Sequence, residues 1–156
     1  MNKLSIGIIR FFESQGFAVV STIDRAGRPH SSCKGLVDIN SSGLIYLLDL
    51  YQGKTYENLK KNPNISITAV DEHRFTGYCL KGKARMVIGD KLKPQIIRAW
   101  ESRITSRIAS RLIKNVQGEK GHPRQPEALL PKPKYLIVMK TEEVVDLSPR
   151  SLKQEG

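Results

Sequence analysis

The fold is decided by residues 17–50, which read FAVVSTIDRAGRPHSSCKGLVDINSSGLIYLLDL. Three segments rich in β-branched and apolar residues are predicted as strands: Phe17–Ile23, His30–Ile39 and Leu44–Leu50. Between them, Asp24–Pro29 and Asn40–Gly43 carry the Gly, Pro, Asn and Asp residues typical of tight turns. Strands joined by such short turns pair antiparallel, so the stretch predicts a β-meander.

The flanking sequence adds helices and further strands. Apolar residues at helical spacing predict a helix over Asn2–Gln15, and a short helix is expected over Lys54–Lys61, closed by Asn62-Pro63. Three more strands are predicted: Asn64–Asp71, Gly77–Ile88 and a final strand within Lys134–Leu147, in the pieces Tyr135–Met139 and Val144–Val145. Antiparallel sheets of this size commonly close into barrels, which removes their edges, so we expect a mainly β fold with added helices.

A helical insertion is expected at about residues 90–116, where apolar residues recur every fourth position from Leu92. Arg103, Arg107 and Arg111 form a basic row on this helix, predicted to be solvated, with a phosphate or partner contact as the alternative. Residues 118–133 contain four prolines and are expected to form a flexible loop. The chain is interpreted as a single domain, residues 1–156.

Composition restricts the environment and the partners. Cys33 and Cys79 form no CxxC pair, so we interpret them as reduced thiols of a cytoplasmic protein. The apolar run near the N-terminus is too short and too interrupted for a membrane span or a signal segment. The net charge of +11 favours anionic ligands, although much of it is explained by a solubilising surface.

The most informative local segment is Asp49–Leu59, where a strand turns through Gly53 into the short helix. Free N–H groups at a helix start attract anions, and Lys54 and Thr55 would add a positive charge and a hydroxyl donor. The segment is therefore a candidate phosphate site, although many helix starts carry a lysine and bind nothing. The glycine spacing of a Walker loop is absent.

A second candidate is the segment Pro29–Gly35, whose small polar residues would let a flat ligand approach the backbone, although in isolation an ordinary strand with exposed serines explains it better. His30, His73 and His122 are scattered, so no metal site is predicted. The motifs GxSxG, HExxH and GxGxxG are absent, which disfavours standard hydrolases and Rossmann dehydrogenases.

These segments, in their order and spacing, resemble the pyridoxamine 5′-phosphate oxidase-like FMN-binding split-barrel family, including the small FMN-binding proteins. The matching segments are Gly16–Thr22, Gly27–Ser32, Gly53–Pro63 with its following strand, and Leu80–Ala84. The resemblance covers roughly residues 10–90, and the run from Lys54-Thr55 to Asn62-Pro63 is its most specific part. It implies a six-stranded antiparallel split barrel, working as a homodimer with one FMN per subunit near the interface.

The resemblance also implies a set of cofactor-binding residues: Ser31, Ser32, Cys33 and Lys34 along the flavin ring, Asp49 and Leu50 beside the ribityl chain, and Lys54 and Thr55 at the phosphate. Asp49 departs from the family, where Ser or Thr is common, and its carboxylate would repel a phosphate. We therefore expect Asp49 to face Lys34 or Lys54 and to orient that lysine.

The favoured function is a flavoprotein oxidoreductase with a small-molecule or protein redox partner, because the cofactor would carry the chemistry that this sequence lacks. Two alternatives stay open: a protein binding the deazaflavin F420 or haem, and a flavin carrier without turnover. A nucleic-acid-binding domain using the arginine row with Lys54, Lys60 and Lys61 is the weakest reading, since no nucleic-acid motif supports it. The substrate and the electron donor cannot be read from the sequence.

Overall fold

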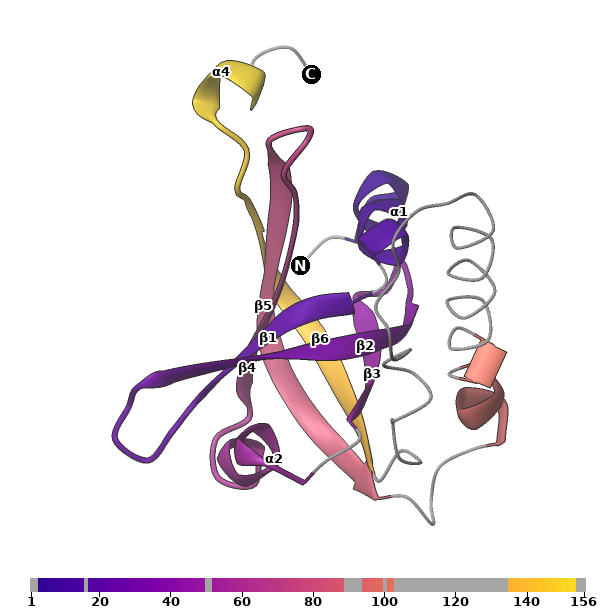
Figure 1. Ribbon diagram of the computed structural model, residues 1–156, viewed down its shortest axis with the longest axis vertical. Coiled ribbons are helices and arrows are strands. Elements are labelled where there is room, and N and C mark those ends of the chain that lie inside the picture. Colours follow the sequence, from indigo (N-terminus) through magenta and orange to yellow (C-terminus); the bar gives the residue numbers. More distant parts are fainter. Residues whose placement is uncertain are drawn as a thin grey trace, which may run out of the picture.

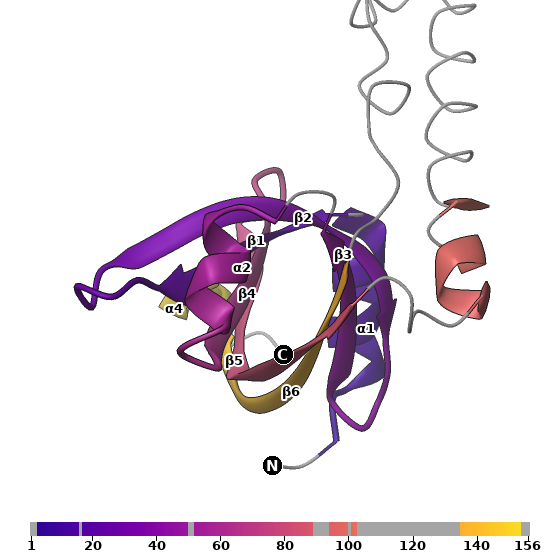
Figure 2. The same ribbon diagram turned by 90° about the horizontal axis from the view of Figure 1, so that it is seen from below.

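The computed structural model describes residues 3–15, 17–49, 52–88, 94–99, 101–102 and 135–153. Six strands make up the sheet: β1 (Phe17–Ile23), β2 (Pro29–Ile39), β3 (Leu44–Asp49), β4 (Asn64–Asp71), β5 (Thr76–Ile88) and β6 (Tyr135–Asp146). All neighbouring strands pair antiparallel, and they close a barrel in the order β1-β2-β3-β6-β5-β4 (Figure 1). Figure 2 shows the strands arranged as a ring. The expected six-stranded antiparallel barrel with peripheral helices is confirmed.

The helix α1 (Ile6–Gln15) is shorter than the predicted Asn2–Gln15. The amide of Leu4 donates to the carbonyl of Ser41 at 2.9 Å, and Leu4 is buried against the barrel. The hydroxyl of Ser5 then accepts the amide of Ile8 at 3.3 Å, so Ser5 caps the helix where it begins. Tertiary contacts of residues 3–5 therefore replace the first predicted turn.

The main core fills the barrel and is closed by two helices. Inward side chains such as Ile45, Ile67 and Ile137 are fully buried, and Phe12 of α1 and Leu59 of α2 (Lys54–Leu59) join the same cluster. Figure 1 shows α1 and α2 on opposite sides of the crossing strands β1 and β2. The predicted two-faced character of β5 is also present, because Leu80 is buried while Lys81 and Lys83 are exposed.

A smaller core lies on the outside of the barrel. Outward residues of three strands pack against part of the helical segment at residues 94–99, through the side chains Val37, Leu48, Leu136, Val138, Ile96, Ile97 and Ala99. This segment covers the outer face of β2, β3 and β6. The rest of the expected insertion, including Arg103, Arg107, Arg111 and the proline-rich loop, lies outside the described residues.

The strand β6 is one continuous element rather than the two predicted pieces. Its polar middle, from Lys140 to Glu143, stays in the sheet because β5 pairs with it on both sides of a register shift at Lys81/Gly82. At that shift Gly82 lies so close to β6 that an added Cβ would stand 1.9 Å from the carbonyl oxygen of Lys140. A short helix, α4 (Arg150–Lys153), follows β6 and was not predicted.

Candidate functional site

A hydroxyl pair joins the two segments that the sequence singled out. Ser32 Oγ on β2 lies 2.9 Å from Thr55 Oγ1 on α2, and either hydroxyl can donate. Thr55 is buried in this contact, whereas the neighbouring Lys54 is exposed. The contact brings the predicted ring-binding strand and the predicted phosphate-binding helix into one site, with Lys54 supplying the accessible charge.

A buried ionic network lies on the same inner side of the barrel. Lys34 Nζ donates to Asp49 Oδ1 at 2.8 Å, and the two side chains are only 13% and 3% exposed. The phenol of Tyr135 donates to the other oxygen of Asp49. Asp49 therefore faces Lys34, one of the two lysines expected, and its negative charge is balanced within the barrel.

Burial is the main cause that raises the pKa of Tyr135 above its ordinary value of 10.0, and the hydrogen bond and the charge of Asp49 raise it further. The ring of Tyr56 packs edge-on against the ring of Tyr135, with centroids 5.0 Å apart. Tyr135 lies 86 residues beyond Asp49, and sequence reasoning treated it only as the start of the last strand. A tyrosine opening an otherwise aliphatic strand was the one available signal.

The alternation of β2 divides the predicted residues between two faces. Ser32 and Lys34 point inward to Thr55 and Asp49, whereas Ser31 and Cys33 are on the exposed face. Ser31 Oγ lies 2.8 Å from Ser21 Oγ on β1. Leu50 lies outside the described residues. The structure therefore brings together Ser32, Lys34, Asp49 and Thr55, and it leaves Ser31 and Cys33 on the outer side of the same strand.

The helix α2 is fixed to the barrel by a buried amide. Asn58 Nδ2 donates to Thr22 Oγ1 on β1 at 3.0 Å, and both side chains are buried. Together with the Ser32–Thr55 contact, this bond holds α2 against β1 and β2. The start of the helix, where Gly53 makes no side-chain cap, is thereby placed at a defined position.

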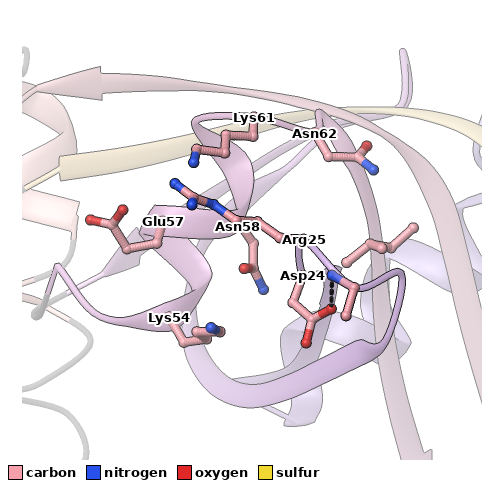
Figure 3. A pocket seen from close by; sticks show the side chains of 9 residues that line it. Asp24, Arg25, Lys54, Glu57, Asn58, Lys61 and Asn62 are labelled. Carbon is pink, nitrogen blue, oxygen red and sulfur yellow. Dashed lines mark hydrogen bonds between the residues drawn. The ribbon is translucent and has the colours of Figure 1, made fainter.

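A pocket of about 640 Å³ opens between α2 and the turn that joins β1 to β2 (Figure 3). Lys54, Asn58 and Lys61 line it from α2 and the residues after it, and Asp24 and Arg25 line it from the turn. Its volume lies within the range of small-molecule sites. Lys54 thus belongs both to the predicted phosphate site and to this pocket.

The outer face of the barrel across β2, β1, β4 and β5 carries short or β-branched side chains. In the strand register, Cys33 lies opposite Val19, Val19 opposite Thr68, and Thr68 opposite Cys79. Phe17 and Val19 on this face are 53% and 37% exposed. Exposed apolar side chains therefore lie on this face beside the exposed residues of β2.

Within the described ranges, no three His, Cys, Asp or Glu side chains are grouped as metal ligands. The helices of this part of the chain include none with the length and apolar character needed to cross a bilayer.

The chemistry the site offers is that of an anion receptor: hydroxyl donors, an exposed ammonium and a neutralised interior.

Comparison with known proteins identifies relatives. A family model described as pyridoxamine 5′-phosphate oxidase matches residues 8–145. No curated protein matches the chain. The chain is similar to the crystal structure of HupZ from Group A Streptococcus, with 20% identity, a TM-score of 0.61, and coverage of 93% of this chain and 95% of that one.

Two further solved structures share the fold. HutZ, the haem storage protein from Vibrio cholerae, has 20% identity and a TM-score of 0.53, with coverage of 93% of this chain and 94% of that one. A pyridoxamine 5′-phosphate oxidase-related, FMN-binding protein from Nostoc punctiforme has 13% identity and a TM-score of 0.58, with coverage of 90% and 79%. Identities this low establish a shared fold only.

Proposed function

Because this chain belongs to the pyridoxamine 5′-phosphate oxidase family, we propose that it binds FMN and acts as an oxidoreductase. The observation that carries the proposal is the Ser32–Thr55 contact, which joins the candidate ring-binding strand to the candidate phosphate-binding helix. The phosphate is assigned to Lys54 and Thr55 at the start of α2. The Thr55 hydroxyl, buried against Ser32, also fixes this end of the helix to β2. The flavin ring is assigned to Ser31–Lys34 of β2.

The residues fit this cofactor in charge as well as in position. A carboxylate beside a phosphate would weaken binding, but Asp49 is paired with Lys34 and hydrogen-bonded by Tyr135. Lys54 forms no ion pair with another described residue, so no described carboxylate neutralises its positive charge. The site therefore presents a net positive charge to an incoming phosphate.

When bound, FMN supplies the electron transfer, and the protein supplies binding and orientation. Lys54 neutralises the phosphate, and β2 positions the ring largely through its backbone groups. No side-chain acid or base is needed for these tasks. The proposed reaction partner is a small molecule or a redox protein.

We further propose that the protein works as a homodimer in the cytoplasm. The exposed apolar residues Phe17, Val19 and Val70 lie on the side of the barrel that residues 94–99 do not cover, so a second subunit would bury them. The free thiols Cys33 and Cys79 support a reducing compartment. Light scattering of the purified chain tests the dimer, and a strict monomer would count against a flavin site completed by a partner.

The alternative cofactor is haem, and its support is the structural likeness to the haem storage protein HutZ. Haem needs an axial ligand, and histidine is the common one. His30 lies on the same face of β2 as Ser32 and Lys34, which makes it the described histidine to test. A Soret band that is lost in His30→Ala, with no retained flavin, would favour haem.

The test of the proposal is an absorbance spectrum after incubation with FMN, F420 or haem and subsequent desalting. We expect flavin bands to be retained with FMN. Lys54→Gln should weaken FMN binding by about tenfold, the value of one charge-assisted hydrogen bond. Lys60→Gln removes the same charge just after α2 and should change the affinity by less than about twofold. Equal losses in both variants, or retention of F420 or haem alone, would refute FMN binding at this site.

A further inference from the structure

We propose that the pocket between α2 and the β1–β2 turn is an anion site for the phosphoryl groups of a second small molecule, distinct from FMN. Its own residues are Arg25 and Lys61, and it borders the candidate flavin site at Lys54. The proposal does not depend on flavin binding, because neither Arg25 nor Lys61 was assigned to the cofactor. We call this pocket the Arg25–Lys61 pocket.

The first support is the convergence of cations from two separate elements. Arg25 comes from the β1–β2 turn, whereas Lys54 and Lys61 come from the start of α2 and from the turn that follows it. In Figure 3 the charged ends of Arg25 and Lys61 extend toward the same side of the pocket. Like charges held over one pocket repel each other unless an anion joins them.

The second support is that the nearby carboxylates are already engaged. Asp24 Oδ1 accepts the amides of Ala26 and Arg28, each at 2.9 Å. Glu57, which also lines the pocket, pairs with Lys60 at 3.6 Å. Among the residues that the structure describes, no ion pair involves Arg25, Lys54 or Lys61. The pocket therefore has cationic capacity that the protein's own described carboxylates do not use.

The third support is that the hydrogen bonds that shape the two walls of the pocket do not involve the side chains of Arg25 or Lys61. The turn is held by Gly27 N–H to the Asp24 carbonyl at 3.0 Å, with Gly27 at a φ of +76° that suits glycine. The opposite wall is held by the buried Asn58–Thr22 bond, and the amide of Asn62 donates to the Asn58 carbonyl at 2.9 Å. The side chains of Arg25 and Lys61 can therefore be changed without removing the bonds that shape the pocket.

The chemistry of the lining identifies the ligand class. A guanidinium presents paired donors that match two phosphoryl oxygens, and ammonium groups add charge beside it. The lining holds the cations Arg25, Lys54 and Lys61 and the carboxylates Asp24 and Glu57, so its net charge is positive and favours an anion. The guanidinium of Arg25 and the ammonium of Lys61 together match the several oxygens of a phosphate ester or a diphosphate. The volume of about 640 Å³ accommodates a small molecule rather than a single inorganic ion.

The test uses calorimetric titration of the full, cofactor-free chain with inorganic pyrophosphate. Arg25→Gln and Lys61→Gln should each weaken binding by about threefold to fivefold, as expected for partly solvated ion pairs. Two controls remove the same charge from exposed positions outside the pocket, where no ion pair with a lining carboxylate is broken: Arg28→Gln and Lys83→Gln. These controls should change the affinity by less than about twofold.

Three outcomes would overturn the proposal. Equal losses in the controls would show that net positive charge, and not the pocket, binds pyrophosphate. Citrate that binds as tightly as pyrophosphate would exclude a phosphoryl-specific site. A parallel loss of FMN retention in Arg25→Gln and Lys61→Gln would assign the pocket to the flavin itself. Conversely, failure of FMN to bind any variant would remove the proposed cofactor while leaving the pyrophosphate result intact.

Discussion

Lys34–Asp49 and Lys81–Glu143 are both lysine–carboxylate pairs joining neighbouring strands, yet they lie on opposite faces of the barrel. The inner pair has an N–O distance of 2.8 Å and side chains 13% and 3% exposed. The outer pair has an N–O distance of 3.5 Å and side chains 51% and 58% exposed. The residue types and the cross-strand geometry are similar, so the difference between the pairs is mainly one of solvent.

This difference distinguishes charged side chains that pair inside the barrel from charged side chains that are exposed and can bind a ligand. Inside the barrel each charge needs its partner, because an unpaired charge that has lost its water is costly. On the outside, water solvates either partner alone, and a lysine there remains free to meet a ligand. The same distinction separates Lys34, which is occupied by Asp49, from Lys54, which is exposed at the candidate site.

The largest expected effect follows from breaking the inner pair. Asp49→Ala leaves the Lys34 ammonium nearly buried without a counter-charge and removes the acceptor of the Tyr135 phenol. We expect a loss of about 3–5 kcal/mol in the free energy of unfolding, measured with urea. A loss below about 1 kcal/mol would mean that the Lys34–Asp49 pair contributes no more than a solvent-exposed ion pair does.

The double variant Lys34→Met/Asp49→Leu is the control for this result. Apolar residues of similar size remove both charges, and such replacements are often neutral or stabilising. The double variant should therefore recover most of the stability that Asp49→Ala loses. If it remained as unstable as the single variant, side-chain packing or the unpaired phenol of Tyr135, and not the unpaired charge of Lys34, would explain the loss.

A smaller effect is expected at Tyr135. Tyr135→Phe keeps the ring against Tyr56 but removes the hydrogen bond to Asp49, which should cost about 1–2 kcal/mol near neutral pH. The raised pKa adds a dependence on pH. Above the ordinary pKa of 10.0 the unfolded phenol ionises while the native one stays protonated, so the wild-type protein loses this contribution as the pH rises.

The measurement for Tyr135 is the free energy of unfolding from neutral to alkaline pH. The difference in stability between the wild type and Tyr135→Phe should narrow above the ordinary tyrosine pKa. Tyr56→Phe makes the same chemical change on the ring that packs against Tyr135, and it should keep the wild-type alkaline decline. A difference that stays constant with pH would mean that Tyr135 titrates alike in both states.

The contrast between the two pairs also explains what could be predicted from the sequence. The bounds of β1 and β4 were predicted as observed, because local β propensity and flanking turn residues mark both ends. Asp49 was expected to face Lys34 or Lys54. The structure selects Lys34 because β2 pairs with β3 so that Gly35 lies opposite Leu48, which places Lys34 beside Asp49.

The remaining features depend on contacts between distant parts of the chain. Tyr135 reaches Asp49 only because β6 inserts between β3 and β5, an order that local patterns do not contain. The middle of β6 is polar and was not predicted as strand, but pairing with β5 keeps it in the sheet. Arg25 lies in a turn and was not predicted as a site residue. Only the folded structure brings it to the same pocket as Lys61.

The smallest expected effect is at the outer pair, and it tests whether this part of the barrel is covered in solution. Lys81→Gln removes an exposed charge, so the free energy of unfolding should change by less than about 0.5 kcal/mol at moderate salt. Glu143→Gln should behave alike, because water replaces the lost partner in either variant. A loss above about 1 kcal/mol that diminishes on dilution of the protein would instead mean that a second subunit covers Lys81–Glu143. The solvent exposure of Lys81 and Glu143 would then depend on the assembly and not on the single chain alone. The homodimer interface would extend onto β5 and β6.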